Sequence, residues 1–145
     1  MPVVNFHLAE GQSSTKQHEQ LLRESCLLYC EVLKAPMDRV RAFITSHTAS
    51  QFTVAGDITR GTGLNHAPYF EFIVLEGRPL EERQRLLSGF TELLVNIMKV
   101  RRELVRGCCR RVDPEDWAIG GVSASVLRKE EISMRAEAAA LSVNK

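Results

Sequence analysis

The sequence predicts an α+β fold in which two tandem β-α-β units form one four-stranded sheet with both helices on one face. Three observations support this: an internal repeat, a helix-period segment within each copy, and strand-like runs on both sides of that segment. Residues 2–12 reappear as residues 68–78, an offset of 66 positions. The 145 residues are therefore expected to form a single domain, 1–145, by duplication.

Later matches set the expected boundaries of the two units. Val40-Arg41 corresponds to Val105-Arg106, and the aromatic-glycine segment after Phe52 corresponds to the one after Trp117, both at an offset of 65. One residue has therefore been inserted or deleted between the earlier and the later matching segments of the two copies. We expect unit one over about 2–57, a connector over about 58–67, unit two over about 68–127 and a C-terminal helical tail over about 128–145.

The first copy begins with an apolar run rich in β-branched and aromatic residues, which favours a strand. Glu10-Gly11 marks a turn, and Ser13 or Ser14 is placed to cap the helix that follows. Lys34-Ala35-Pro36 predicts the end of that helix. Its apolar residues recur at helical spacing, with a stripe at Leu22, Cys26, Tyr29 and Leu33 and with Leu21, Leu28 and Val32 alongside.

The second copy repeats this order. Pro79 suits the first turn of a helix. Each unit is expected to end with a second strand, here called its closing strand, over 40–45 in the first unit and 104–109 in the second. The apolar stripe of the second helix comprises Leu86, Leu87, Phe90, Leu93, Leu94, Ile97 and Met98.

Strands joined through a helix of this length favour right-handed units with parallel strands. One face of the sheet would then lack a helical cover. We expect the strands to carry exposed apolar side chains on that face, which would drive an oligomer that packs sheets together. The aromatic residues assigned to these strands are Phe6, Phe43, Phe70 and Phe72.

Composition narrows the possible function classes. The formal net charge is +1, and the basic residues are interspersed with acidic ones apart from two Arg-Arg pairs, so no nucleic-acid partner is expected. No apolar run approaches the ~20 residues that span a bilayer, and no signal peptide is apparent. We expect a cytoplasmic protein without a membrane partner. The four histidines and four cysteines lack metal-site spacing, so no metal site is expected.

Pro2 is the most informative residue for chemistry. Aminopeptidases generally remove an initiator methionine before so small a residue, and the proline would then carry a free secondary amine. An α-amino group titrates near pH ~7.7 to 8.0, so nearby positive charge could keep it neutral and basic at physiological pH. Pro68 cannot repeat this role, because its nitrogen is an internal amide.

These features together resemble the tautomerase superfamily. The unit is similar to 4-oxalocrotonate tautomerase, on the basis of Pro2, the Leu-Ala-Glu-Gly turn at residues 8–11 and the Leu-Glu-Gly-Arg segment at residues 75–78. Two units in one chain resemble the fused relatives, which include malonate semialdehyde decarboxylase and the chloroacrylic acid dehalogenases. The resemblance implies the tautomerase fold, a small carboxylate substrate and no cofactor. It also implies a homotrimer, which would hold the six units of the single-unit family's hexamer.

The resemblance assigns roles to individual residues. Pro2 matches the base, and Arg78 matches the turn arginine that binds a substrate carboxylate. Gln12 occupies the equivalent turn position of the first copy. Arg41 and Arg106 match the closing-strand arginine that polarises the carbonyl, and Phe52 and Trp117 match the apolar wall of the pocket. A guanidinium binds a carboxylate through a planar fork and would also lower the pKa of an adjacent Pro2 ammonium.

Three functions follow from the resemblance. The leading hypothesis is an isomerase in which Pro2 shifts a proton in a small unsaturated 2-oxo or enol acid. The alternative is a hydratase, dehalogenase or decarboxylase of a three-carbon acid, with Pro2 as the acid and a water-activating carboxylate at Asp116, Glu115 or Asp38. Leu75 stands where the dehalogenases would carry a further arginine. A non-catalytic trimeric binding protein is the third hypothesis, which applies if Met1 is retained.

Overall fold

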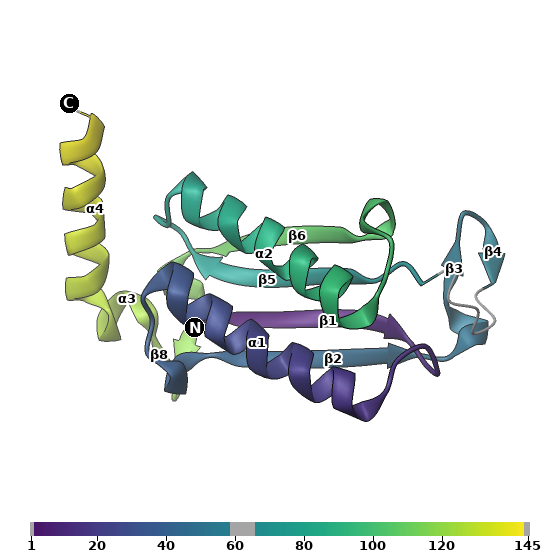
Figure 1. Cartoon of the computed structure of the whole chain (residues 1–145). Helices are drawn as coiled ribbons and strands as arrows, with labels where there is room; N and C mark the ends of the chain where they lie inside the picture. The colour runs from purple at the N-terminus through teal and green to yellow at the C-terminus, as the bar shows by residue number, and fades with distance from the viewer. Residues whose placement is uncertain (1, 59–65, 144–145) are drawn as a thin grey trace.

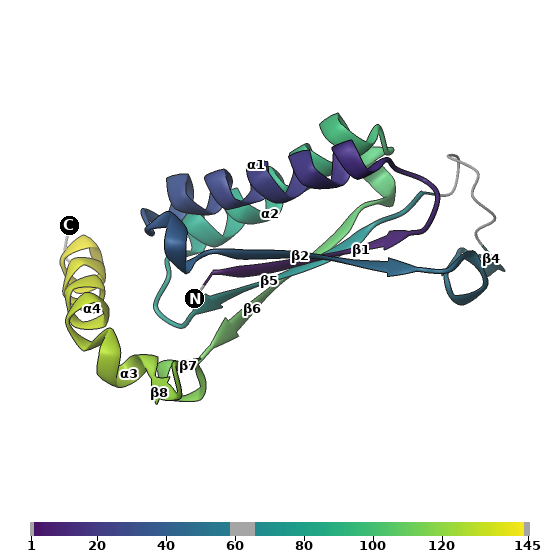
Figure 2. The same ribbon diagram turned by 90° about the horizontal axis from the view of Figure 1, so that it is seen from below.

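A computed structural model describes residues 2–58 and 66–143 and contains one four-stranded sheet with two long helices across one face (Figures 1 and 2). The strand order is β2-β1-β5-β6. The strands are β1 (Val3–Ala9), β2 (Arg41–His47), β5 (Tyr69–Leu75) and β6 (Arg106–Val112), and the helices are α1 (Thr15–Leu33) and α2 (Leu80–Met98). The predicted α+β class and the placement of both helices on one face are confirmed.

The sheet is mixed, with its one antiparallel pairing at the centre. β1 pairs in parallel with β2, and β5 pairs in parallel with β6, as expected for two β-α-β units. β1 and β5 run antiparallel with Phe6 opposite Phe70. As a result, the first residues of β1 and β5 lie at opposite ends of the sheet, and so do Pro2 and Pro68.

The core lies between the two helices and the sheet face that they cover. Phe6, Phe70 and Phe72 are fully buried there, and Phe90 of α2 packs edge-on against Phe6. Tyr29 of α1 is buried too, and its hydroxyl donates to the backbone carbonyl of Val3 at 2.8 Å. Large aromatic side chains bury much apolar area each, so these residues contribute strongly to the hydrophobic stabilisation.

The prediction that four phenylalanines occupy the uncovered face is therefore wrong for three of them. Side chains alternate between the two faces of a strand, and this alternation directs Phe6, Phe70 and Phe72 toward the helices. Only Phe43 of the four, 53% exposed, lies on the open face.

Beside Phe43, the open face carries a hydrogen-bonded polar network. The Nδ1 atom of His7 lies 2.9 Å from Nε2 of His47, and Thr45 donates to Asn5 at 2.9 Å. Register places these residues side by side on β1 and β2, which are neighbours in the sheet.

Most helix boundaries match the sequence prediction. Ser14 caps α1 by accepting from the backbone nitrogen of Gln17, whose side chain accepts in return from the backbone nitrogen of Ser14. Pro79 stands at the N-cap of α2, one residue before the first helical turn in which the sequence places it. Of the residues predicted for the apolar side of α1, Leu21, Tyr29, Val32 and Leu33 are buried. Leu22 and Cys26 are only partly buried, and Ser25 faces the core instead.

The closing strands begin later than predicted. Short 3₁₀ turns, η1 (Met37–Arg39) and η4 (Arg102–Leu104), precede them, so β2 begins at Arg41 and β6 at Arg106. The turn η2 (Ala49–Gln51) and the hairpin of β3 (Thr53–Val54) and β4 (Asp57–Ile58) follow β2. The turn η5 (Pro114–Asp116) and the hairpin of β7 (Ala118–Ile119) and β8 (Val122–Ser123) follow β6.

The C-terminal segment forms α3 (Ala124–Leu127) and α4 (Lys129–Val143). α4 stands at the end of the sheet where β1 begins, apart from α1 and α2 (Figures 1 and 2). Residues 59–65 of the predicted connector lie outside the described residues. No helix in the described part of the chain is long and apolar enough to cross a membrane.

Candidate functional site

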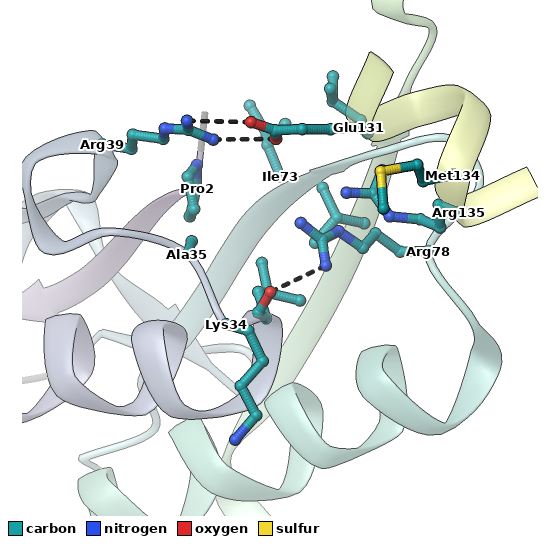
Figure 3. A pocket seen from close by; sticks show the side chains of 12 residues that line it. Pro2, Lys34, Ala35, Arg39, Ile73, Arg78, Glu131, Met134 and Arg135 are labelled. Atoms are coloured by element: carbon teal, nitrogen blue, oxygen red, sulfur yellow. Dashed lines mark hydrogen bonds and ion pairs between the residues drawn. The ribbon is translucent and has the colours of Figure 1, made fainter. Parts of the chain in front are cut away.

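A cavity of about 290 Å³ lies at the end of the sheet where β1 begins. Four parts of the chain line it: Pro2, the segment that follows α1, β5 with the turn after it, and α4 (Figure 3). Its charged residues are Lys34, Arg39, Arg78, Glu131 and Arg135.

Pro2 is buried immediately before β1 and borders this cavity. Its carbonyl accepts a hydrogen bond from the backbone nitrogen of Arg41 at 2.9 Å, which fixes the residue against β2. Pro68 makes the matching bond with Arg106 at 3.1 Å, at the other end of the sheet. The two prolines therefore occupy equivalent positions in separate surroundings.

Arg78 extends into the same cavity from the turn between β5 and α2. Gly77 before it has a φ of 99°, a left-handed conformation that glycine adopts without strain. The Nη1 atom of Arg78 donates to the carbonyl of Leu33 at 3.0 Å and lies 3.4 Å from the carboxylate of Glu82. The Leu33 carbonyl is one of the unpaired acceptors at the end of α1, so this contact anchors the arginine and ties the two units together.

Arg39 and Glu131 face each other across the cavity (Figure 3). The two Nη atoms of Arg39 donate to the two carboxylate oxygens of Glu131, each at 3.1 Å. This bidentate pair lowers the pKa of Glu131, first through the hydrogen bond with Arg39. Glu131 therefore remains a carboxylate at neutral pH.

Arg135 stands one helical turn beyond Glu131 on α4. Burial lowers the pKa of Arg135, and the positive charge of Arg78 lowers it further. The cavity thus carries three guanidinium groups, those of Arg39, Arg78 and Arg135, against the carboxylate of Glu131. Its electrostatic character favours an anionic ligand.

Sequence reasoning missed Arg39, Glu131 and Arg135. Glu131 and Arg135 are four residues apart on a helical segment and so share one face of α4, which was a usable signal. The sequence does not show that the C-terminal segment turns back toward Pro2.

Three other predicted residues, Arg41, Trp117 and Asp38, line a second cavity of about 390 Å³. The Nη1 atom of Arg41 donates to the backbone carbonyl of Asp38 at 2.8 Å. This cavity shares Arg39 with the first one, so it lies on the Pro2 side of the sheet.

Arg106 and Phe52 line a third cavity of about 320 Å³, next to Pro68. The Nη1 atom of Arg106 donates to the carbonyl of Glu103 at 2.7 Å. Glu115 and Asp116 are exposed in η5. Within one chain, the structure thus brings Pro2 and Arg78 together but not Arg106, Phe52 or the two acids of η5.

The described residues contain no group of three or more His, Cys, Asp or Glu side chains that could hold a metal ion. Burial raises the pKa of the Cys26, Cys30 and Cys109 thiols, and the four cysteines are all free.

The chain matches no protein-family model. It is 34% identical over 58 residues to a 2-hydroxymuconate tautomerase of Pseudomonas putida, covering 40% of this chain and 90% of that protein. A 2-hydroxymuconate tautomerase of Stutzerimonas stutzeri is 33% identical over 63 residues, covering 43% of this chain and 98% of that protein.

Solved structures resemble the chain over most of its length. A protein inactivated by 2-oxo-3-pentynoate superposes with a TM-score of 0.78, at 21% identity over 86% of this chain and 98% of the other. A fused 4-OT wild-type symmetric trimer gives 0.76 at 21% identity, covering 86% of this chain and 98% of the other. A member of the cis-3-chloroacrylic acid dehalogenase family gives 0.73 at 14% identity, covering 90% of this chain and 98% of the other. At these identities the structural matches establish the fold.

Proposed function

The chain belongs to the tautomerase superfamily as a member with two fused units, and we propose that it is an isomerase that shifts a proton in a small unsaturated 2-oxo or enol acid. The observation that carries the proposal is that Pro2 and Arg78 border one cavity, although 76 positions (78 minus 2) separate them. The curated relatives, named as 2-hydroxymuconate tautomerases, support the reaction class.

Pro2 serves as the base in this proposal. Hydrolytic removal of Met1 converts its amide nitrogen into a secondary amine. The lone pair of that amine takes a proton from the substrate, the electrons of the broken bond enter the conjugated system, and the resulting ammonium returns a proton at another carbon. In this proposal the excess of positive charge in the cavity, from Arg39, Arg78 and Arg135 against Glu131, disfavours the ammonium form of Pro2 and so favours the neutral amine.

Arg78 binds the substrate carboxylate. Its attachment to the Leu33 carbonyl uses one Nη atom, and a guanidinium has five N–H donors in all. The remaining donors are available to hold a carboxylate near the proline nitrogen and to stabilise the negative charge that develops on the 2-oxo group.

We further propose a homotrimer. Two units per chain would give six β-α-β units, and solved fused 4-OT structures of the same fold are described as trimers. In such an assembly the closing-strand arginines, Arg41 and Arg106, are assigned to the site of a neighbouring chain, with Phe52 and Trp117 as its apolar wall.

One observation favours the hydratase, dehalogenase or decarboxylase alternative: a carboxylate, that of Glu131, borders the same cavity as Pro2. In that chemistry a protonated Pro2 would act as the acid and a carboxylate would activate water. The ion pair with Arg39 engages both oxygens of Glu131, which opposes such a role. Halide release from 3-chloroacrylate, measured on the same protein, tests this alternative, and turnover of that acid would replace the isomerase with it.

The test combines mass and kinetics. Intact-mass measurement establishes whether Met1 is absent from the protein, and ultraviolet assays follow ketonisation of 2-hydroxymuconate and phenylenolpyruvate. Pro2→Ala should lower kcat/KM by about 10²- to 10⁴-fold, the range for general base catalysis. Pro68→Ala is the matched control, because it removes the equivalent proline of the second unit without touching an amine. Retention of Met1, or equal activity of Pro2→Ala and wild type, would eliminate the proline mechanism. Retention of Met1 would favour the hypothesis of a non-catalytic trimeric binding protein.

A further inference from the structure

The side chains of Arg135 and Arg78 meet inside the cavity although they come from different elements, α4 and the turn before α2 (Figure 3). The two groups are close enough for the charge of Arg78 to act on Arg135. Within residues 2–58 and 66–143, Arg135 makes no hydrogen bond or ion pair, and Glu82 and Glu131 act on it only through longer-range attraction.

Two like charges held together in a partly buried place repel each other, and Glu82, 3.4 Å from Arg78, offsets only part of this repulsion because it makes no ion pair with Arg135. The Arg78 side chain is only 14% exposed, so water screens this repulsion poorly. A carboxylate placed at both guanidinium groups would relieve it and would gain charge-assisted hydrogen bonds from each. The arrangement is therefore suited to bind a carboxylate.

Elsewhere in the cavity, the guanidinium of Arg39 is already engaged. Glu131 presents its two oxygens to the two Nη atoms of Arg39, which is the geometry that a substrate carboxylate would adopt. A substrate with a second carboxylate would have to displace Glu131 and would be repelled by its negative charge.

We propose that α4 determines substrate specificity: Arg135 joins Arg78 in binding one carboxylate, and Glu131 occupies Arg39 so that a second carboxylate is excluded. The proposal rests on the isomerase function above and narrows its substrate class to monocarboxylic 2-oxo or enol acids. Ile73 and Met134, which line the same cavity, offer apolar surface for the uncharged end of the substrate. The volume of about 290 Å³ lies at the lower limit of ligand pockets and suits a small acid.

The kinetic test compares a monocarboxylic substrate, phenylenolpyruvate, with a dicarboxylic one, 2-hydroxymuconate. Arg135→Gln should raise KM for phenylenolpyruvate by about 10- to 150-fold, which corresponds to the loss of a charge-assisted hydrogen bond. Arg135→Lys should recover only part of this loss, because an ammonium keeps the charge but lacks the planar fork. Glu131→Gln should shift the ratio of kcat/KM toward the dicarboxylate by at least tenfold.

Controls come from the same helix. Lys129→Gln and Glu130→Gln make matching charge changes at neighbouring positions that are exposed. Both should keep the wild-type KM values and the wild-type ratio. If Arg135→Gln fails to fold by circular dichroism, Arg135→Lys provides the comparison on its own.

A binding measurement separates this proposal from the isomerase function. Calorimetry with unreactive acids, 3-phenylpropionate and adipate, requires no turnover. Wild type should bind 3-phenylpropionate more tightly, Arg135→Gln should lose that preference, and Glu131→Gln should gain affinity for adipate. These results in a protein that lacks isomerase activity would support the specificity element and reject the isomerase. Proline-dependent turnover with unaltered binding and KM in Arg135→Gln and Glu131→Gln would overturn the present proposal alone.

Discussion

Arg39 and Glu131, 92 residues apart in the sequence, form a bidentate ion pair with two N–O distances of 3.1 Å. The pair joins α4 to the turn η1 immediately before β2, next to Pro2. It is half exposed on the Glu131 side, so we expect it to orient α4 more than to stabilise the whole fold.

Acidification should loosen α4. The pKa of Glu131 is lowered in the folded protein, so the contribution of its carboxylate is complete above the ordinary glutamate pKa of about 4.3 and is lost as pH falls through the lowered value. Hydrogen exchange measured between about pH 5 and pH 3, corrected for intrinsic rates, should show falling protection of α4 amides in wild type. In Glu131→Gln this protection should be low throughout; equal pH dependence in both proteins would refute the role of the pair.

The two turn positions should differ in substrate binding. Arg78→Ala should raise KM for an anionic substrate by about 10- to 150-fold through loss of charge-assisted hydrogen bonds, and Gln12→Ala should fall well below that range. Steady-state kinetics on folded variants provides the comparison. A fall in kcat at constant KM would instead assign Arg78 to stabilisation of the enolate. If both variants behave as wild type, Arg78 does not bind the carboxylate, and Arg41 and Arg106 become the candidates for that role.

Gly107 of β6 should tolerate no side chain. A Cβ built there lies 2.2 Å from Cζ of Phe70, a ring that is fully buried against β6. Gly107→Ala should therefore lower the free energy of unfolding by about 1 to 3 kcal/mol, the usual cost of overpacking. Urea unfolding measures this, with Cys108→Ala on the opposite face of the strand as the control. Equal midpoints for the two variants would show that Phe70 can move aside.

The chain should form a homotrimer at micromolar concentration. Sedimentation equilibrium should give about three times the 16.3 kDa mass of one chain. A stable monomer would contradict the trimer and would remove Arg41 and Arg106 of a neighbouring chain from the site.

Much of the fold could be predicted because the duplication repeats the same local signals. A strand, a capped helix and a second strand occur twice, and no long-range information is needed to recognise them. The choice of face could not be predicted as readily. Phe6 and Phe43 are both aromatic strand residues, but alternation and register bury the first and expose the second.

Part of the candidate site could likewise be predicted from the sequence, and part could not. Pro2 and Arg78 could be proposed from the repeat, because each occupies a fixed place in its unit. Arg39, Glu131 and Arg135 come together through the path of the tail after β8, which has no counterpart in the repeat. Arg41 and Arg106 illustrate a further limit: both matched the repeat, yet within one chain their side chains donate to nearby backbone carbonyls and lie in other cavities.

Covalent labelling of Pro2 tests the central claim most directly. A protein of the same fold was inactivated by 2-oxo-3-pentynoate, a small 2-oxo acid that can capture a neutral amine. Peptide mapping by mass spectrometry after treatment of the processed chain should find one adduct, on the Pro2 nitrogen, with labelling and loss of activity in step. A chain extended before Pro2 should remain unlabelled at that position. Adducts confined to cysteines, or inactivation without modification of Pro2, would contradict the account.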